Sequence, residues 1–212
     1  MPIEFGGTLF GILVFEDNSV NAFSRMDEEL FSIMARHIAA AWKMRTILDE
    51  LKDQALRDPM TGLWNTRYLR NRIDEEIARS ERHGSPFTVV MIDVRNFKMI
   101  NDRHGHLEGD LVIRSVGEKL LAGVRQYDAV VRYGGDEFVI ILPGTSREEA
   151  ERLIKRMGSV VVEMGNGTME TIRLDSGVAV FGEDGNTAEE ILKKADTGMY
   201  GKKNDSQKRG RS

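Results

Sequence analysis

The chain has 212 residues, of which 41% are hydrophobic. This is enough for one domain with a full-sized core and a smaller additional module. Its 30 Lys and Arg residues are balanced by 34 Asp and Glu residues. This balance excludes the basic field with which proteins bind duplex nucleic acid, so any nucleotide partner is expected to be small.

Cysteine and apolar runs set two further limits. The chain contains no Cys, which excludes a disulfide scaffold and thiolate metal sites and leaves carboxylates as the expected metal ligands. No apolar run is long enough to span a bilayer, and the first residues lack the pattern of a signal peptide. We therefore expect no membrane segment in this chain and a cytoplasmic location.

The N-terminal part predicts a little sheet and then a long helix. Residues 8–15 have the composition of a strand, and residues 17–19 that of a turn. Ser24, with Asp27 three residues later, resembles a helix N-cap, and the helix is expected to continue to about Leu56. One or two strands cannot close a core by themselves.

The long helix carries apolar residues at alternating spacings of four and three. They are Leu30, Met34, His37, Ala41, Met44, Leu48, Leu51 and Ala55. This heptad spacing predicts a coiled coil that pairs two subunits over residues 27–56. The alternative is an ordinary helix packed on its own domain, which the histidine and the two alanines of the seam favour.

A second domain is predicted to begin near Asp58, because Pro59 and Gly62 break the helix. Residues 65–82 are predicted to form a helix that ends at a His-Gly pair. Residues 87–94 form a nearly continuous apolar run, which is typical of a strand buried on both faces.

The remaining elements interleave helices with strands. Helices are predicted at 107–121, 147–157 and 187–203, and strands at 129–133, 137–142 and 171–181. The strands at 129–133 and 137–142 flank Gly134-Gly135-Asp136 as a hairpin. The order predicts an α/β fold.

Two aspartates could form a metal site. Asp93 lies near the end of the buried strand and Asp136 lies in the hairpin turn, so one sheet edge could hold both carboxylates. Such a hard oxygen site suits Mg²⁺ that bridges substrate phosphates, with Lys98 and Lys203 as counter-charges. The alternative for either aspartate is a solvated turn residue, but the adjacent glycines would allow a phosphate or base to approach closely.

One segment resembles a known family. Residues 132–138, Arg-Tyr-Gly-Gly-Asp-Glu-Phe, reproduce the signature of the GGDEF diguanylate cyclases. Further blocks that match in order and spacing lie at 58–63, 93–102, 105–110 and 195–200. The resemblance covers about residues 57–205. It implies a GGDEF domain over 57–212, with a central mixed, mostly antiparallel sheet flanked by helices, as in nucleotidyl cyclase and palm-type domains.

The resemblance implies an enzyme that condenses two GTP molecules into cyclic di-GMP and two pyrophosphates. The metal, Mg²⁺ or alternatively Mn²⁺, would be held by Asp93, the carbonyl of Val94 and Asp136. The catalytic residues would be Asp136, which helps to deprotonate the ribose 3′-hydroxyl, Glu137, which supports the same site, and Lys98, which neutralises phosphate charge.

The resemblance also implies the substrate contacts. They are made by Asn101, His106, Asp110, Gly134, Gly135 and Lys203. Asp110 would accept hydrogen bonds from the paired N–H donors of guanine, which a carboxylate matches and adenine does not offer. Selectivity for GTP over ATP is expected.

Feedback inhibition and dimerisation are implied as well. Each subunit of this family holds one GTP, so a homodimer must bring two subunits face to face. Arg125 and Asp128 match the family's inhibitory site, where the product cyclic di-GMP binds. The alternative is a surface ion pair at the same spacing.

Residues 1–42 resemble the end of a GAF sensory domain and are too few to form that fold.

The sequence departs from the family pattern at several positions. Arg95 stands where the family usually has a second aspartate, which could weaken metal binding or add a phosphate contact. Thr66 replaces a usual arginine, Lys202 a usual alanine, and the tail lacks the common Gly-Arg-Asn ending. Two alternatives stay open: a degenerate domain that binds GTP or cyclic di-GMP without turnover, and a structural dimeriser.

Overall fold

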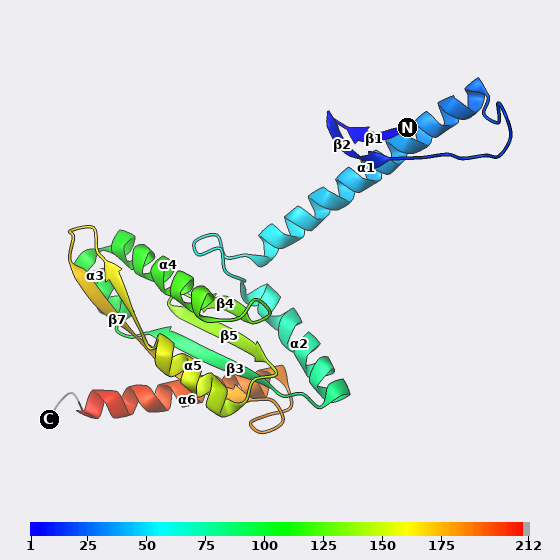
Figure 1. Ribbon diagram of the computed structural model, residues 1–212. Coiled ribbons are helices and arrows are strands. Elements are labelled where there is room, and N and C mark those ends of the chain that lie inside the picture. Colours follow the sequence, from blue (N-terminus) through cyan, green and yellow to red (C-terminus); the bar gives the residue numbers. More distant parts are fainter. Residues whose placement is uncertain (210–212) are drawn as a thin grey trace. The chain divides into compact units, whose positions relative to one another are not determined.

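The chain divides into two compact units, residues 1–55 and residues 56–212, and each is described by itself. The computed structural model describes the backbone of residues 1–209 and the side chains of residues 1–199 (Figure 1). None of the helices in the described part is both long and apolar enough to cross a membrane.

The first unit is a hairpin and a long helix. Strands β1 (Pro2–Phe5) and β2 (Thr8–Ile12) pair antiparallel, and α1 spans Arg25–Leu56. The predicted strand is therefore shorter than expected, and β1 was not predicted. The predicted N-cap is confirmed, because the Ser24 hydroxyl oxygen accepts a hydrogen bond from the N–H of Asp27 (3.3 Å), and the Asp27 carboxylate accepts one from the N–H of Ser24 (2.7 Å).

Small and aromatic side chains form the contacts within this unit. Ala35 and Ala39 are the buried residues of α1. The ring of Phe31 on α1 stacks on that of Phe15 at a centroid distance of 3.7 Å, and Phe23 meets it edge-on at 5.4 Å. This packing occupies only one side of the helix.

The heptad seam lies outside that packed side. Its large apolar members are all more than 40% exposed in the single chain: Leu30, Met34, Met44, Leu48 and Leu51. Exposed large apolar side chains on this scale are characteristic of an interaction surface. The predicted pairing through this seam remains a prediction.

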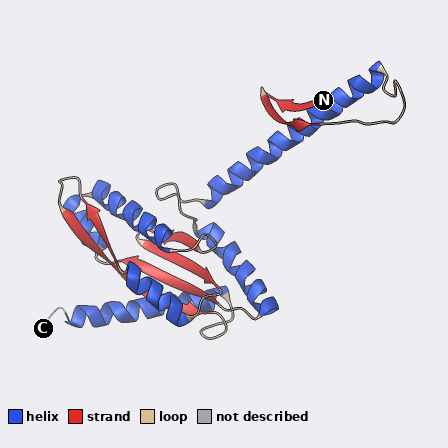
Figure 2. Cartoon of the chain, in the orientation of Figure 1, coloured by secondary structure: helices blue, strands red, loops and turns tan. Residues whose placement is uncertain are grey.

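The second unit is a five-stranded sheet flanked by helices, which confirms the predicted fold class (Figures 1 and 2). The strands follow the spatial order β4-β5-β3-β7-β6, and every ladder is antiparallel. Their bounds are β3 (Phe87–Val94), β4 (Ala129–Gly134), β5 (Glu137–Pro143), β6 (Ser159–Glu163) and β7 (Met169–Val180). Strand β6 is an addition to the predicted elements.

Five helices complete the described part of this unit, residues 56–209. They are α2 (Thr66–His83), α3 (Phe97–His104), α4 (His106–Gly123), α5 (Arg147–Met157) and α6 (Ala188–Arg209). The side chain of Asn65 caps α2 by accepting hydrogen bonds from two backbone N–H groups. Gly84 ends α2 in the left-handed conformation, with φ of 66°.

Strand β3 is buried along its whole length because both faces of the sheet are covered. Its even-numbered residues, such as Val90 and Ile92, pack in the core beneath α4 and α5. Its odd-numbered residues, such as Val89 and Met91, pack in the core beneath α2 and α6. The prediction that residues 87–94 form a strand buried on both faces is thus confirmed.

Helix α6 lies unusually close to β7 at Gly177. A Cβ atom at that position would stand 1.9 Å from the carbonyl oxygen of Ala195 and 2.5 Å from the backbone nitrogen of Met199. Both atoms belong to the backbone of α6, so neither can move without moving the helix. Only glycine permits this approach.

We expect Gly177→Ala to destabilise the domain by about 3 kcal/mol, because α6 must shift away from the sheet. The control is Gly198→Ala, whose Cβ would lie at an ordinary contact distance of 3.7 Å from Gly177. That change removes a helical glycine and should be neutral or stabilising by up to about 1 kcal/mol. Urea unfolding curves measure both, and equal stabilities would contradict the account.

Candidate active site

The end of β3 brings the predicted metal ligands together. Asp93 is 6% exposed, and its Cα partner on β5 is Glu137. The N–H of Val94 donates a hydrogen bond of 3.1 Å to the carbonyl of Asp136. The hairpin turn and the end of β3 are therefore adjacent, as the sequence predicts, and Asp136 is half-buried there.

These residues fit a hard divalent cation. Their donors are carboxylate and carbonyl oxygens, which are the ligands that Mg²⁺ prefers. In the described part of the chain, no group of three or more His, Asp or Glu side chains is arranged to hold a metal ion. Two carboxylates and a carbonyl leave coordination positions that substrate phosphates can complete.

The hairpin turn leaves room beside these carboxylates. The β4–β5 pairing shifts register between Arg132 and Gly134, so the chain bulges before the turn. Among the described residues, a Cβ atom at Gly135 would meet nothing within 4 Å, and one at Gly134 would meet the Glu137 carboxylate at 3.4 Å. A phosphate or base can therefore approach the backbone of this turn.

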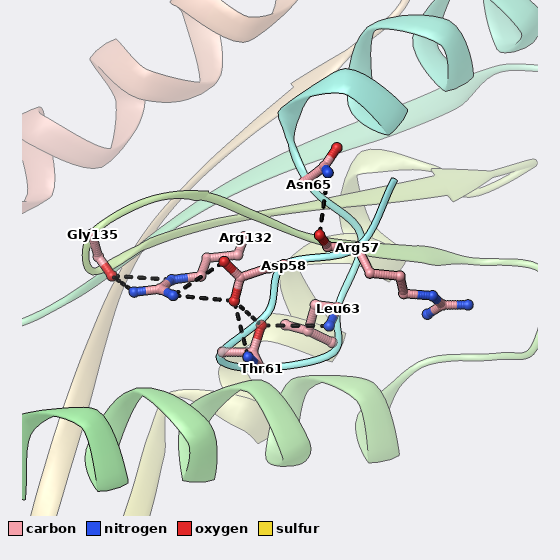
Figure 3. A network of polar contacts seen from close by, with 7 residues as sticks. All are labelled: Arg57, Asp58, Thr61, Leu63, Asn65, Arg132 and Gly135. Carbon is pink, nitrogen blue, oxygen red and sulfur yellow. Dashed lines mark hydrogen bonds and ion pairs between the residues drawn. The ribbon is translucent and has the colours of Figure 1, made fainter. Parts of the chain in front are cut away.

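One arginine ties the turn to the start of the domain (Figure 3). Arg132 donates to the carbonyl of Gly135 through Nε (3.3 Å) and Nη2 (2.9 Å). Its Nη1 donates to both carboxylate oxygens of Asp58, at 3.1 and 3.2 Å. The same guanidinium group thus joins the hairpin tip to the opening turn, a link that the sequence did not reveal.

Asp58 is itself held in a fixed orientation. Its carboxylate accepts hydrogen bonds from the N–H (2.9 Å) and the hydroxyl (2.7 Å) of Thr61. Burial alone would raise the pKa of Asp58, but the hydrogen bonds from Thr61 and the Arg132 guanidinium outweigh it and hold this pKa below its ordinary value. The carboxylate is therefore ionised and stays paired at neutral pH.

Helices α3 and α4 carry four of the predicted catalytic and substrate residues. Lys98 and Asn101 lie on α3, which begins three residues after β3 ends, while His106 and Asp110 lie in the first turns of α4. The side-chain oxygen of Asn101 is buried without a hydrogen-bond partner in the described part of the chain. A buried acceptor of this kind suits a ligand that offers N–H donors.

Asn101 and α4 meet at a glycine. A Cβ atom at Gly109 would lie 1.8 Å from the side-chain oxygen of Asn101, so this position accommodates only glycine unless the asparagine moves. Gly109 precedes Asp110, which places Asn101 and Asp110 on adjoining parts of one helix pair. Lys203 falls within α6, but its side chain lies outside the described residues.

Comparison with known proteins identifies the family. A family model described as "Diguanylate cyclase, GGDEF domain" matches residues 55–209. The chain belongs to the GGDEF family. Diguanylate cyclase DgcP from Pseudomonas aeruginosa is 36% identical over 157 residues, which are 72% of this chain and 23% of DgcP. The chain thus spans about a quarter of the length of this relative.

Solved structures agree with that assignment. Diguanylate cyclase SiaD of Pseudomonas aeruginosa, solved in complex with its activator SiaC, is 32% identical, with a TM-score of 0.70 over 85% of this chain and 69% of SiaD. The GGDEF domain of DgcB from Caulobacter crescentus, solved in complex with cyclic di-GMP, is 25% identical, with a TM-score of 0.67 over 72% of this chain and 89% of that domain.

A second polar site of the GGDEF domain surrounds Arg125 and Asp128. The N–H of Arg125 donates to the Asp128 carboxylate (2.8 Å), and its guanidinium donates to the Tyr127 hydroxyl (2.9 Å). Burial raises the pKa of Asp128, against the opposing effects of the Arg125 N–H and charge. Its second carboxylate oxygen is buried without a hydrogen-bond partner among the described residues.

Two cavities adjoin Arg125. One of about 430 Å³ is lined by Arg125 and Asp128 and also by Arg152 and Arg156 of α5. Another of about 420 Å³ is lined by Arg125 and by Arg79 of α2. Sequence reasoning missed Arg79, Arg152 and Arg156, because exposed arginines on helices resemble ordinary surface residues.

Arg95, the departure from the family pattern, contacts a residue that the sequence did not single out. Its Nε donates to both carboxylate oxygens of Asp175 on β7, at 3.1 and 3.0 Å, and its Nη2 donates to the same group. Asp175 is 3% exposed. The only signal in the sequence was an aspartate inside a predicted strand.

We expect Arg132→Met to lower turnover of the GGDEF domain at least tenfold and stability by about 2 kcal/mol, because the hairpin tip loses its clamp. The control is Arg57→Met in the same turn. That change removes the stacking of Arg57 on Trp64, at 3.6 Å to the ring centroid, and the 3.1 Å hydrogen bond from its guanidinium to the carbonyl of Gly62, while the Arg132–Asp58 pair stays in place. Turnover and thermal unfolding measure both variants, and equal losses of turnover would contradict the positioning role.

The pH dependence of this clamp follows from the lowered pKa of Asp58. Its contribution to stability is present above the unfolded-state pKa of about 3.9 and is lost only as the pH falls through the lower folded-state value. The stability difference between the wild type and Arg132→Met should therefore be constant from pH 8 to pH 5. A difference that disappeared within that window would contradict the pairing.

Proposed function

We propose that this GGDEF domain condenses two GTP molecules into cyclic di-GMP and two pyrophosphates. The observation that carries the proposal is the junction of Asp93 with the hairpin turn of Asp136 and Glu137. This junction brings carboxylates together at the C-terminal end of β3, beside the backbone of a turn that a phosphate can approach. The similarity to DgcP and SiaD supports the same reaction.

The reaction needs a deprotonated 3′-hydroxyl and a stabilised α-phosphate. When bound by Asp93, the Val94 carbonyl and Asp136, Mg²⁺ or Mn²⁺ would supply electrostatic stabilisation of the phosphate charge. The Asp136 carboxylate accepts the proton of the ribose 3′-hydroxyl. Glu137, the next residue, supports the same site. The 3′-oxygen then bonds to the α-phosphorus of the facing GTP, and the bond to pyrophosphate breaks.

The charged and polar residues around this edge position the nucleotide. Lys98, exposed on α3, neutralises phosphate charge, and Lys203 of α6 is proposed for the same task. Asp110 accepts from the paired N–H donors of guanine, and the buried oxygen of Asn101 accepts a further N–H. His106 completes the contacts at the start of α4.

Ring closure requires two subunits, since each GGDEF domain is proposed to hold one GTP. The exposed seam of α1 supplies a pairing surface with heptad spacing, so we propose a homodimer joined by a coiled coil over residues 27–56. The catalytic domain then spans 57–212. Residues 1–42 are proposed to be the end of a sensory domain that controls the pairing.

Feedback inhibition is proposed at the cavities around Arg125. Cyclic di-GMP carries two phosphates and two guanines, and the site offers arginines together with the Asp128 carboxylate. The structure of the DgcB domain with cyclic di-GMP supports a product site in this family. Because Asp128 precedes β4 and Gly134 ends it, the product would bind at the opposite end of that strand from the hairpin turn.

Asp136→Asn tests the proposed reaction directly. Purified protein is incubated with GTP and Mg²⁺, and cyclic di-GMP is quantified by chromatography. We expect the variant to lose at least about 100-fold in turnover, because it removes a metal-ligand charge and the proton acceptor. Asp74→Asn, at an exposed position on α2, is the control and should retain wild-type turnover.

The wild type decides between the candidate functions in the same assay. If it bound GTP but formed no cyclic di-GMP, the domain would be a binding module without turnover. If Asp136→Asn retained wild-type turnover, the assignment of this residue would be wrong.

Arg125→Ala should raise steady-state output by relieving inhibition, because a methyl group cannot replace the guanidinium contacts to the product. In the wild type, added cyclic di-GMP should lower the maximal rate even at saturating GTP. Arg114→Ala, an exposed arginine on α4, should leave inhibition intact. Competition with GTP, or unchanged inhibition of Arg125→Ala, would overturn the inhibitory assignment and leave the cyclase assignment standing.

A further inference from the structure

Three acidic residues form a row across the sheet at the end of β3. Asp93 has Glu137 as its Cα partner on β5 and Asp175 as its Cα partner on β7. Directly opposed residues of antiparallel strands point to the same face, with Cβ atoms about 5 Å apart. The three carboxyl groups therefore belong to one face, the side on which α2 and α6 cover the sheet.

The carboxylate of Asp175 is the most deeply buried of this row. As whole residues, Asp175 is 3% exposed and Asp93 is 6% exposed. Two buried carboxylates on opposed strands repel each other unless a positive charge or a cation lies nearby. The described structure provides that positive charge as the guanidinium group of Arg95.

Arg95 is fixed on Asp175 by side-chain and backbone contacts. Its Nε reaches both oxygens of Asp175, at 3.1 and 3.0 Å, and Nη2 adds a further hydrogen bond. Its backbone N–H donates to the carbonyl of Arg173 at 2.9 Å, which extends the β3–β7 ladder by one residue. The guanidinium is thus held on Asp175, the residue directly opposite Asp93 on β7.

We propose that Arg95 is a positioning residue that keeps Asp175 out of the proposed metal site. By engaging both oxygens of Asp175 and cancelling its charge, Arg95 leaves Asp93 and Asp136 as the carboxylates that face the cation. Two carboxylates and a carbonyl hold a cation weakly, so nucleotide phosphates must complete its coordination. The arginine thereby makes cation binding depend on GTP. This inference rests on the metal site of the proposed function.

The consequence is a latent third ligand. Without the guanidinium, the Asp175 carboxylate would regain its charge beside Asp93, and a hard cation would gain both a ligand and an uncancelled negative charge. Affinity for divalent cations in the absence of nucleotide should then rise. A residue that merely braced β3 against β7 would change stability without raising this affinity.

The test measures Mn²⁺ binding to the nucleotide-free full chain, by isothermal titration calorimetry and by electron paramagnetic resonance of the free ion. We expect Arg95→Met to bind Mn²⁺ at least tenfold more tightly than the wild type. Arg95→Lys retains the charge and should stay within about threefold of the wild type. Both readouts are independent of cyclase turnover.

A double-mutant cycle identifies Asp175 as the source of the gain. Arg95→Met combined with Asp175→Asn removes one positive and one negative charge, so its Mn²⁺ affinity should return to within about threefold of the wild type. A gain that persisted in the double variant would overturn the proposal. So would an Arg95→Met affinity within twofold of the wild type.

Asp175→Asn alone covers the case in which Arg95→Met does not fold. It leaves the Arg95 charge uncancelled at the strand position opposite Asp93, so Mn²⁺ binding in the presence of a non-hydrolysable GTP analogue should weaken at least fivefold. Unchanged binding would overturn the proposal.

A direct phosphate contact is the competing role for Arg95. If Arg95→Met weakened binding of the analogue in the absence of metal and left Mn²⁺ affinity unchanged, Arg95 would contact phosphate and the proposal would fail. A wild type without turnover would refute the proposed reaction, yet the nucleotide-free titrations would still decide the role of Arg95.

Discussion

The pairing of β3 with its two neighbours is the constraint on which the rest of the domain depends. Because β3 is buried on both faces and hydrogen-bonded on both edges, its register fixes what stands beside Asp93. A shift by one residue would turn Asp93 toward the opposite core. The hydrogen bond from Val94 to the Asp136 carbonyl then locates the hairpin turn at the same edge.

Carboxylates near this edge are balanced by arginines that also join separate segments. Arg132 pairs with Asp58 and holds the hairpin tip, and Arg95 pairs with Asp175 and joins β3 to β7. Each pair is largely shielded from solvent, so removing one member would leave a poorly compensated charge. Near the proposed metal site, these two arginines cancel the charges of Asp58 and Asp175.

Strand β4 separates the proposed catalytic and inhibitory sites. It runs from Ala129 to Gly134, so Asp128 precedes one end and the glycine pair begins at the other. Six residues of strand extend about 20 Å, which is too far for a product bound at Arg125 to displace GTP by contact. Inhibition through this site would therefore act on the arrangement of domains in the proposed dimer.

The sequence by itself determined the elements whose signal is local. The apolar run of 87–94, the glycine pair with its acidic neighbours and the family motifs predicted the buried strand, the hairpin and the candidate site residues, because spacing and composition express them directly. Strand β6, the Arg132–Asp58 clamp, the Arg95–Asp175 pair and the arginines of the second site were decided only by tertiary structure. Their partners lie far apart along the chain, 74 residues for the clamp and 80 for the pair, and only the folded domain brings them together.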